Sequence, residues 1–242
     1  MRLTKGRGST LTKDVPHFDP PSRREQAIPT PMTSIPWEAL STDAGAFAMV
    51  VDPRANIAFA SPTWNLILGL SQVSGKPLSD AMGKDFASER QLIHDRVLSG
   101  GKPESLLGMV GGHLLRTTFR CVPLSEAPPE PGVLATSCIL REGMDLDGVP
   151  LAVHHDLGHL QGLTERELEL LHHMGNGCSS EDAAERMHRS TRTIEWHRAS
   201  LGEKLRCDNR VQLARIAIAS GLTAVGIETL RLIHRSAKGR RG

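Results

Sequence analysis

Tyrosine is absent from the sequence, and the other aromatic residues are few, with five Phe and three Trp. Reaction mechanisms and ligand pockets that depend on a tyrosine hydroxyl are therefore excluded. The four cysteines lie far apart and form no C-x-x-C pair, so neither a zinc ribbon nor a disulfide framework is indicated, and a reducing cytoplasm is expected. No run of apolar residues approaches the roughly 18 that a membrane span needs, and no signal peptide is predicted.

The charges of the chain are nearly balanced, with 29 Lys and Arg against 27 Asp and Glu and a formal net charge of +2. So small a surplus does not by itself imply a nucleic-acid partner, and any basic patch has to be local. The length of 242 residues favours two small domains. Residues 1–36 are rich in Pro, Ser and Thr, show no helical or strand period, and are expected to form a disordered basic leader.

Residues 37–142 consist of short apolar stretches separated by turn residues. Residues 46–51 and 57–60 are predicted to be the strands of a hairpin, because the residues between them, Asp52 to Asn56, have turn chemistry. A helix is expected after Ser61-Pro62, with Ser61 as its cap.

A second helix is expected to end at Gly100, and its buried side is assigned to Leu92, Ile93, Val97 and Leu98. Three strand-like runs follow, at 106–110, 113–122 and 132–140. The pattern predicts a small α+β domain.

This order of two strands, short helices and three strands resembles a PAS domain, as do the phrases Val50-Val51-Asp52-Pro53 and Val73-Ser74-Gly75-Lys76-Pro77-Leu78. Ser61 stands where the family usually has Asn. The resemblance implies a fold and a role in sensing or dimerisation, but no particular ligand, so the cofactor stays unknown. His94 and His113 are candidate haem ligands, although a lone His is more often a surface or hydrogen-bonded residue.

Residues 143–162 contain enough Gly and Pro to be a linker. The cluster formed by His154, His155, Asp156 and His159 has side chains suited to zinc, but it lies beside glycines and lacks a distant further ligand, so no metal site is predicted. The sequence motifs of serine hydrolases, phosphate-binding loops and zinc proteases are all missing. We therefore expect no enzymatic activity.

The helical part of the chain begins with a capping signal at Thr164 and Glu167. In this pair the Thr hydroxyl accepts the Glu backbone N–H, and the Glu side chain accepts the Thr backbone N–H. A second helix is predicted at about 180–188. A third starts after its N-cap Ser190 and buries Ile194, Leu201 and Leu205, and a fourth is predicted at 209–221. Two short helices joined by a tight turn form a helix-turn-helix, whose second helix fits the DNA major groove, about 12 Å wide.

A set of residues in this region occurs in a characteristic order and spacing: Leu163-Thr164, Arg166-Glu167, Leu170-Leu171, Gly177, Ala184, Ser190, Thr193-Ile194, His197, Lys204-Leu205 and Asn209-Arg210. The set resembles the DNA-binding domain of LuxR-type regulators, which is also found in FixJ-like response regulators. The resemblance implies DNA binding through the third helix and control of transcription. Arg189, where the family usually has an apolar residue, and Gly202 within the third helix depart from its pattern.

The resemblance gives six candidate DNA-binding residues, which are Thr191, Arg192, Glu195, Trp196, Arg198 and Ala199. Glu195, Trp196 and Ala199 occupy places that often meet bases, whereas Arg192 and Arg198 suit phosphates. Glu195 can accept a hydrogen bond from cytosine N4 but also repels phosphate, which leaves the recognised bases open. Trp196 is equally compatible with a packing role, and His197 is interpreted as structural.

Residues 163–222 contain nine Lys or Arg and nine Asp or Glu, so DNA binding would depend on local placement of charge. Residues 225–242 have five basic residues against Glu228 and are expected to form a basic tail that adds sequence-independent affinity for DNA.

The expected architecture is an α+β PAS-like sensor domain at 37–142, the linker, an all-α four-helix LuxR-type helix-turn-helix domain at 163–224, and the tail. The expected function is that of a cytoplasmic transcriptional regulator that binds double-stranded DNA as a homodimer. RNA polymerase is a further candidate partner, a small molecule is a candidate ligand of the PAS-like domain, and no membrane partner is expected. The alternative is a PAS adaptor protein whose helix-turn-helix contacts another protein.

Overall fold

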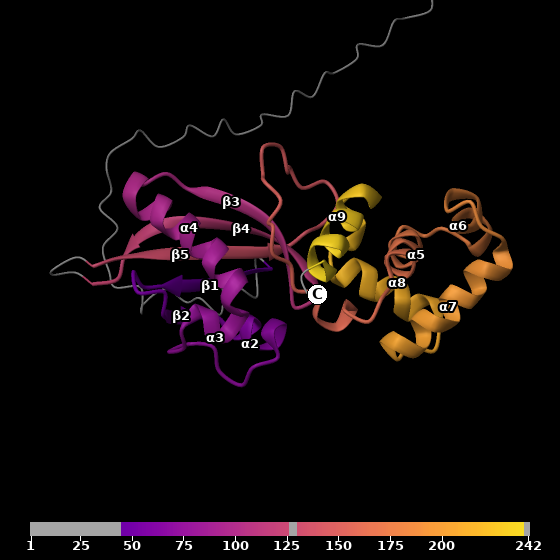
Figure 1. Ribbon diagram of the computed structural model, residues 1–242, viewed down its shortest axis with the longest axis horizontal. Coiled ribbons are helices and arrows are strands. Elements are labelled where there is room, and N and C mark those ends of the chain that lie inside the picture. The colour runs from indigo at the N-terminus through magenta and orange to yellow at the C-terminus, as the bar shows by residue number, and fades with distance from the viewer. Residues whose placement is uncertain (1–44, 126–129, 240–242) are drawn as a thin grey trace, which may run out of the picture. The chain divides into compact units, whose positions relative to one another are not determined.

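The computed structural model describes residues 45–125 and 130–239 (Figure 1). The leader expected at 1–36 lies outside these residues, as do Arg240 and Arg241 of the expected tail. An antiparallel sheet with helices makes up the first part of the described chain, and helices make up the rest. None of the helices within the described ranges is long and apolar enough to cross a membrane.

All neighbouring strands of the sheet are antiparallel, in the order β2-β1-β5-β4-β3. The strands are β1 (Ala46–Val51), β2 (Ile57–Ala60), β3 (Glu104–Val110), β4 (His113–Pro123) and β5 (Pro131–Ile139). The predicted hairpin of β1 and β2 is confirmed, and the Asp52 carboxylate closes its turn by accepting the backbone N–H groups of Arg54 and Asn56. Two strands, helices and three strands follow one another as predicted, and the fold is PAS-like.

Three helices pack on the sheet, namely α2 (Pro62–Leu68), α3 (Leu78–Met82) and α4 (Lys84–Gly100). The helix predicted after Ser61 is present, but the Ser61 hydroxyl does not cap it. That hydroxyl accepts the backbone N–H of Ala48 at 3.2 Å, because Ser61 is fully buried beside β1.

Helix α4 buries Ile93 and Val97 as predicted, whereas Leu92, which was assigned to the same side, is 62% exposed. The reason is that adjacent residues on a helix point about 100° apart. Because Ile93 faces the sheet, Leu92 is turned toward the solvent.

The segment expected to be a linker is bound to the edge of the sheet. The backbone of Leu107 in β3 donates to the Pro150 carbonyl at 2.9 Å and accepts from the Ala152 N–H at 2.7 Å, and Asp156 donates to Met109 at 2.9 Å. The Glu89 carboxylate accepts the N–H groups of the two residues after Ala152. The chain therefore covers backbone groups that an edge strand would otherwise leave open.

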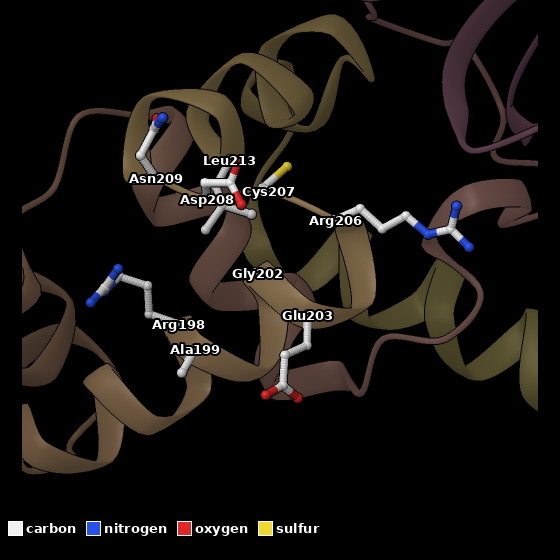
Figure 2. A pocket seen from close by; sticks show the side chains of 9 residues that line it. All are labelled: Arg198, Ala199, Gly202, Glu203, Arg206, Cys207, Asp208, Asn209 and Leu213. Atoms are coloured by element: carbon white, nitrogen blue, oxygen red, sulfur yellow. The ribbon is translucent and has the colours of Figure 1, made fainter.

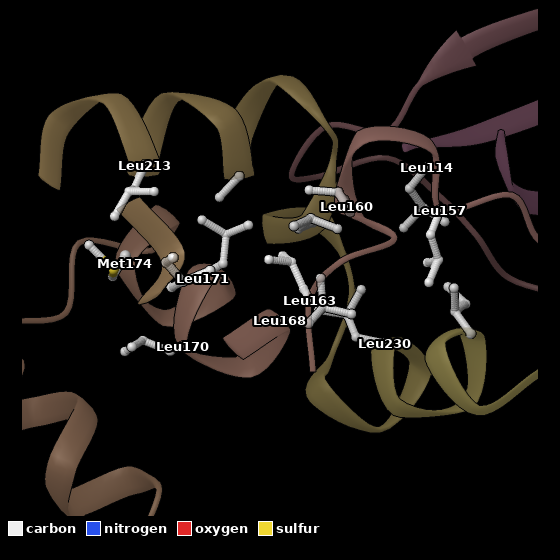
Figure 3. Packing of buried hydrophobic residues seen from close by; sticks show 14 of the residues in the cluster. Leu114, Leu157, Leu160, Leu163, Leu168, Leu170, Leu171, Met174, Leu213 and Leu230 are labelled. Carbon is white, nitrogen blue, oxygen red and sulfur yellow. The ribbon is translucent and has the colours of Figure 1, made fainter. Parts of the chain in front are cut away.

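A hydrophobic cluster continues from this segment into the helices. Leu157, Leu160 and Leu163 are buried in one cluster with Leu114 of β4 and with Leu230 near the end of the chain. Figure 3 shows Leu160 and Leu163 between Leu114 on one side and Leu171 on the other. Full burial of a leucine side chain contributes about 1.5–3 kcal/mol. These contacts explain why the segment has a defined course although it contains little regular structure.

The helices of the second part are α5 (Glu165–Gly175), α6 (Ser180–Arg186), α7 (Thr191–Leu205), α8 (Arg210–Ala219) and α9 (Ile227–Lys238). The sequence analysis did not predict α9, and described its residues only as a basic tail. Leu230 and Ile233 lie on its buried side, while Arg231 and Arg235 pair with Glu169 and Glu165 of α5, both at 3.0 Å. Its basic residues therefore serve partly to fix this helix to α5.

We expect Gly158→Ala to destabilise the protein far more than Gly148→Ala. Both glycines have left-handed backbone conformations, with φ of 45° and 68°, which cost about 1–2 kcal/mol for other residues. A Cβ at Gly148 would meet nothing within 4 Å, whereas one at Gly158 would lie 2.2 Å from the backbone carbon of Gly111. Urea unfolding of the full chain measures the difference, and equal losses would show that the close approach at Gly158 is unimportant.

Candidate nucleic-acid interface

The buried carboxylate of Glu167 joins α5 to α7. The predicted capping pair is confirmed, since Thr164 donates its N–H to Glu167 Oε2 at 2.7 Å and accepts the Glu167 N–H at 3.2 Å. The same carboxylate accepts the Ser200 hydroxyl at 2.6 Å and the Lys204 ammonium group at 2.6 Å, both from α7. Glu167 thus caps one helix and fixes the C-terminal half of another.

The ionisation of Glu167 is set by two opposing effects. Burial raises the pKa of its carboxyl, but the hydrogen bonds from Lys204, Ser200 and Thr164 outweigh burial and lower that pKa to about 2. Glu167 is therefore negatively charged at neutral pH although its side chain is only 2% exposed. Its charge is balanced by Lys204 within the domain.

A tight turn connects α6 to α7. Helix α6 starts with a capping box formed by Ser179 and Asp182, and the turn after it contains His188 in the left-handed conformation with φ of 52°. The prediction that Ser190 caps α7 is confirmed, because its hydroxyl accepts the Thr193 N–H at 3.2 Å. Helices α6 and α7 form the predicted helix-turn-helix.

Helix α7 has one buried and one exposed face. Ile194 and Leu201 are buried as predicted. Four of the six candidate DNA-binding residues are classed as exposed, which are Thr191, Arg192, Trp196 and Ala199. No residue in the described part of the chain covers this face.

The other two candidates, Glu195 and Arg198, bind each other. Arg198 Nε donates to Glu195 Oε2 at 2.7 Å, and the Ser180 hydroxyl of α6 donates to Glu195 Oε1 at 2.5 Å. The hydrogen bonds from Ser180 and Arg198 lower the pKa of Glu195. Glu195 is therefore ionised and directed toward α6, and its charge is offset by Arg198.

A groove of about 440 Å³ lies beside the C-terminal half of α7 and the loop to α8. Figure 2 shows Arg198 and Arg206 extending on opposite sides of Gly202, with Asp208 and Asn209 in the loop. Gly202 departs from the family pattern, and the structure explains why glycine is needed at this position. A Cβ there would lie 2.8 Å from the Cys207 carbonyl oxygen. The groove has basic and acidic walls and does not by itself select an anion.

The histidines considered as metal or haem ligands are used in other ways. His155 Nδ1 accepts the backbone N–H of Met109 at 3.2 Å, and the Asp156 carboxylate accepts N–H groups of Gly111 and Gly158. No group of three His, Cys, Asp or Glu side chains within 45–125 and 130–239 is placed to hold a metal ion. The hydrogen bonds of His155 and Asp156 instead attach the segment expected to be a linker to the sheet.

The two candidate haem ligands lie in different places. His94 is buried beside Phe119, and burial lowers its pKa to about 4, so its ring is neutral at pH 7. Burial also lowers the pKa of His113, whose ring lies 5.4 Å from that of His159. Neither arrangement identifies a cofactor.

Sequence reasoning missed the residues that orient the candidate interface. Ser180 holds Glu195, and Ser200 and Lys204 hold Glu167, in each case across two helices. The sequence contains no local signal for these pairs, since hydroxyl and ammonium groups on a helix surface usually face water.

Comparison with known families matches residues 161–217 to the bacterial regulatory proteins of the luxR family. The match confirms the prediction of a LuxR-type helix-turn-helix domain in this part of the chain. No curated protein matches the sequence.

Three solved structures illustrate the similarities. A VqmA dimer of Vibrio cholerae is 20% identical, with 80% of this chain and 90% of that chain covered and a TM-score of 0.36. A phage VqmA in complex with DPO is 20% identical, with 78% and 88% covered and a TM-score of 0.39. The PAS domain of nitrogen regulation protein NR(II) from Vibrio parahaemolyticus is 15% identical, with 44% and 99% covered and a TM-score of 0.31.

We expect Glu167→Gln to destabilise the protein by about 3 kcal/mol at pH 7, because a carboxyl whose pKa falls from 4.5 to about 2 on folding stabilises the folded state when ionised. This contribution is complete above about pH 4.5 and is lost as the pH falls toward 2. Urea unfolding between pH 7 and pH 3 should show the wild type and the variant converging in acid.

The matched control is Glu165→Gln, which removes a partly exposed carboxylate from the same helix turn. We expect less than about 1 kcal/mol for that change, because exposed ion pairs contribute little. A difference between wild type and Glu167→Gln that stays constant across this pH range would contradict the role of the ionised carboxylate.

Proposed function

We propose, on the premise that residues 161–217 form a DNA-binding domain of the LuxR family of bacterial regulatory proteins, that this protein is a sequence-specific regulator of transcription. It binds double-stranded DNA in the cytoplasm through α7. The observation that carries the proposal is the exposed face of α7, where Thr191, Arg192, Trp196 and Ala199 lie opposite a buried face.

The dimensions of α7 suit this role. Its 15 residues give a length of about 22 Å, and an α-helix fits the major groove, which is about 12 Å wide. The N-terminal residues of a recognition helix are those that usually contact base edges in helix-turn-helix complexes. Thr191, Arg192 and Trp196 belong to the first two turns of α7.

Arg192 is the best candidate for a phosphate contact. It is exposed and has no hydrogen-bond or ion-pair partner among the residues that the structure describes. Arg198 and Lys204, by contrast, are bound to Glu195 and Glu167. A domain with equal numbers of acidic and basic residues can thus still present a free positive charge at its DNA-binding face, because several other charges are paired within the domain.

The protein acts as a homodimer in this proposal, so that two copies of α7 read half-sites one helical turn apart. Helix α8 supports pairing, because the apolar residues Val211 and Ile218 are 68% and 56% exposed and lie seven residues apart on the helix. RNA polymerase is the further partner that such control of transcription would involve.

The PAS-like domain controls the helix-turn-helix in this proposal. The Leu114 N–H at the start of β4 donates to the Ser220 carbonyl at the end of α8 at 2.9 Å, and the Ser220 hydroxyl lies 3.3 Å from His159 Nε2. A change in the sheet therefore has a direct contact through which to act on α8.

A small-molecule signal would act at the cavity between the sheet and α4. Trp64, Arg90 and His94 are among the residues that line it, and neither Trp64 Nε1 nor His94 Nδ1 has a hydrogen-bond partner among the described residues. The cavity has a volume of about 30 Å³, which is room for about one or two water molecules. A metabolite would have to open it.

The second candidate function is that of an adaptor whose helix-turn-helix binds a protein. The balanced charge of residues 163–222 and the acidic Glu195 favour this reading. The dependence of affinity on salt separates the two functions, because a complex with DNA releases counterions from the phosphates.

We expect selection from genomic fragments with the full-length protein to enrich a nearly palindromic site, whose affinity falls steeply with salt. Arg192→Ala should weaken binding to every sequence about equally, and should reduce the slope of log affinity against log salt by about one. Fluorescence anisotropy at several salt concentrations measures both effects.

Arg54→Ala is the matched control, since Arg54 is an exposed arginine in the turn between β1 and β2. It should leave the affinity and the salt slope unchanged. If the folded protein enriches no fragment at low salt, the proposed function as a DNA-binding regulator is rejected and the function as a protein-binding adaptor is favoured.

A further inference from the structure

The exposed face of α7 has an apolar centre. Trp196 is 65% exposed, whereas the other large apolar residues in the middle of this helix, Ile194 and Leu201, are almost completely buried. Ala199 lies three residues after Trp196, on the same side of the helix, and is exposed too. We call the surface formed by Trp196 and Ala199 the apolar strip.

Polar neighbours of the apolar strip are already bound within the domain. Glu195 accepts from Ser180 and Arg198, as described above, and the Thr193 hydroxyl lies 2.8 Å from that of Ser190. The Ser200 hydroxyl donates to Glu167. What remains in the middle of the exposed face is the indole ring of Trp196 and the methyl group of Ala199.

Only one group that the bases present in the major groove is apolar, and that is the C5-methyl group of thymine. The other groups there are hydrogen-bond donors or acceptors, which the Ala199 methyl and the faces of an indole ring cannot satisfy. An exposed indole is also a large apolar surface, of the kind that usually becomes buried when a protein binds its partner.

The charges around the apolar strip fit a nucleic-acid partner. Arg192 lies one turn before Trp196 on the same face. Its guanidinium group has no hydrogen-bond or ion-pair partner among the described residues. The carboxylate of Glu195 is neutralised by Arg198 at 2.7 Å, whereas Glu203, one turn after Ala199, is exposed and has no ion-pair partner among the described residues. Phosphates at the N-terminal end of α7 would therefore meet the positive charge of Arg192, while the base edges would meet the apolar strip.

From these contacts we propose that Trp196 and Ala199 recognise the C5-methyl group of thymine, so that each half-site contains a thymine opposite the apolar strip. This inference rests on the proposed function, because it names the base chemistry that the same helix would read. It assigns Trp196 a specificity-determining role and assigns Glu195 a positioning role within the protein.

The test replaces one thymine of the enriched site at a time by deoxyuridine, which removes the methyl group and keeps the hydrogen-bonding groups of the base. Fluorescence anisotropy at fixed salt gives the Kd of each duplex. At one or two positions in each half-site we expect the Kd of the wild type to rise about fourfold. This change corresponds to the loss of about 0.8 kcal/mol, the contribution of one buried methyl group.

The same duplexes are then measured with Trp196→Ala. We expect this variant to bind more weakly and to lose the difference between thymine and deoxyuridine at those positions, while its salt slope stays that of the wild type. Leu92→Ala is the matched control, because Leu92 is a similarly exposed apolar residue of α4 in the sheet domain. It should respond to the missing methyl group as the wild type does. Thermal unfolding verifies that both variants are folded.

The possible results separate the inference from the function on which it rests. If the wild type binds a specific site but no deoxyuridine substitution changes the Kd, the proposed recognition of thymine is wrong. The proposed function as a DNA-binding regulator is then retained. The inference is equally overturned if Trp196→Ala keeps the full response to the missing methyl group. If the folded wild type selects no DNA at all, both the function and the inference are rejected.

Discussion

The candidate interface depends on one buried carboxylate. Glu167 accepts hydrogen bonds from Thr164 at the start of α5 and from Ser200 and Lys204 on α7, so a single side chain links the two helices. A buried charge is tolerated only when its lone pairs are satisfied, and here four donor groups satisfy them. The orientation of the exposed face of α7 follows from this arrangement.

Pairing of charges within the helical part explains how a domain without net charge can present an unpaired arginine at the exposed face of α7. Glu195 is bound to Arg198, Glu167 to Lys204, and Glu165 and Glu169 to arginines of α9. These acidic residues are directed toward the protein. The basic Arg192 is left at the exposed face, so the placement of charges and not their sum determines the local potential.

The segment between the sheet and α5 makes the two parts of the chain share buried contacts. Backbone hydrogen bonds attach residues 150–156 to β3, and the leucines that follow belong to the same hydrophobic cluster as α5 and α9. A closely packed cluster of this kind changes between distinct arrangements more readily than it deforms continuously. In the proposed function, this cluster is the physical route by which a change in the sheet reaches α8.

Local sequence patterns by themselves determined the hairpin of β1 and β2, the alternation of strands and helices, and the capping residues Thr164 and Ser190. These features depend on residues a few positions apart, so their signals are present in short stretches of sequence. The helix-turn-helix followed from the same kind of pattern, whereas the candidate role of Arg192 came from the resemblance to LuxR-type regulators.

Only the tertiary structure decided which charged side chains face the solvent. Glu167 meets partners 33 and 37 residues away, and Glu195 meets Ser180 on the preceding helix. The segment expected to be a linker adds to the edge of the sheet, and the segment expected to be a basic tail forms α9. Both make hydrogen bonds with residues about 45 to 70 positions earlier in the chain. No local pattern encodes such contacts, since they form when the packing of distant elements brings a donor to an acceptor.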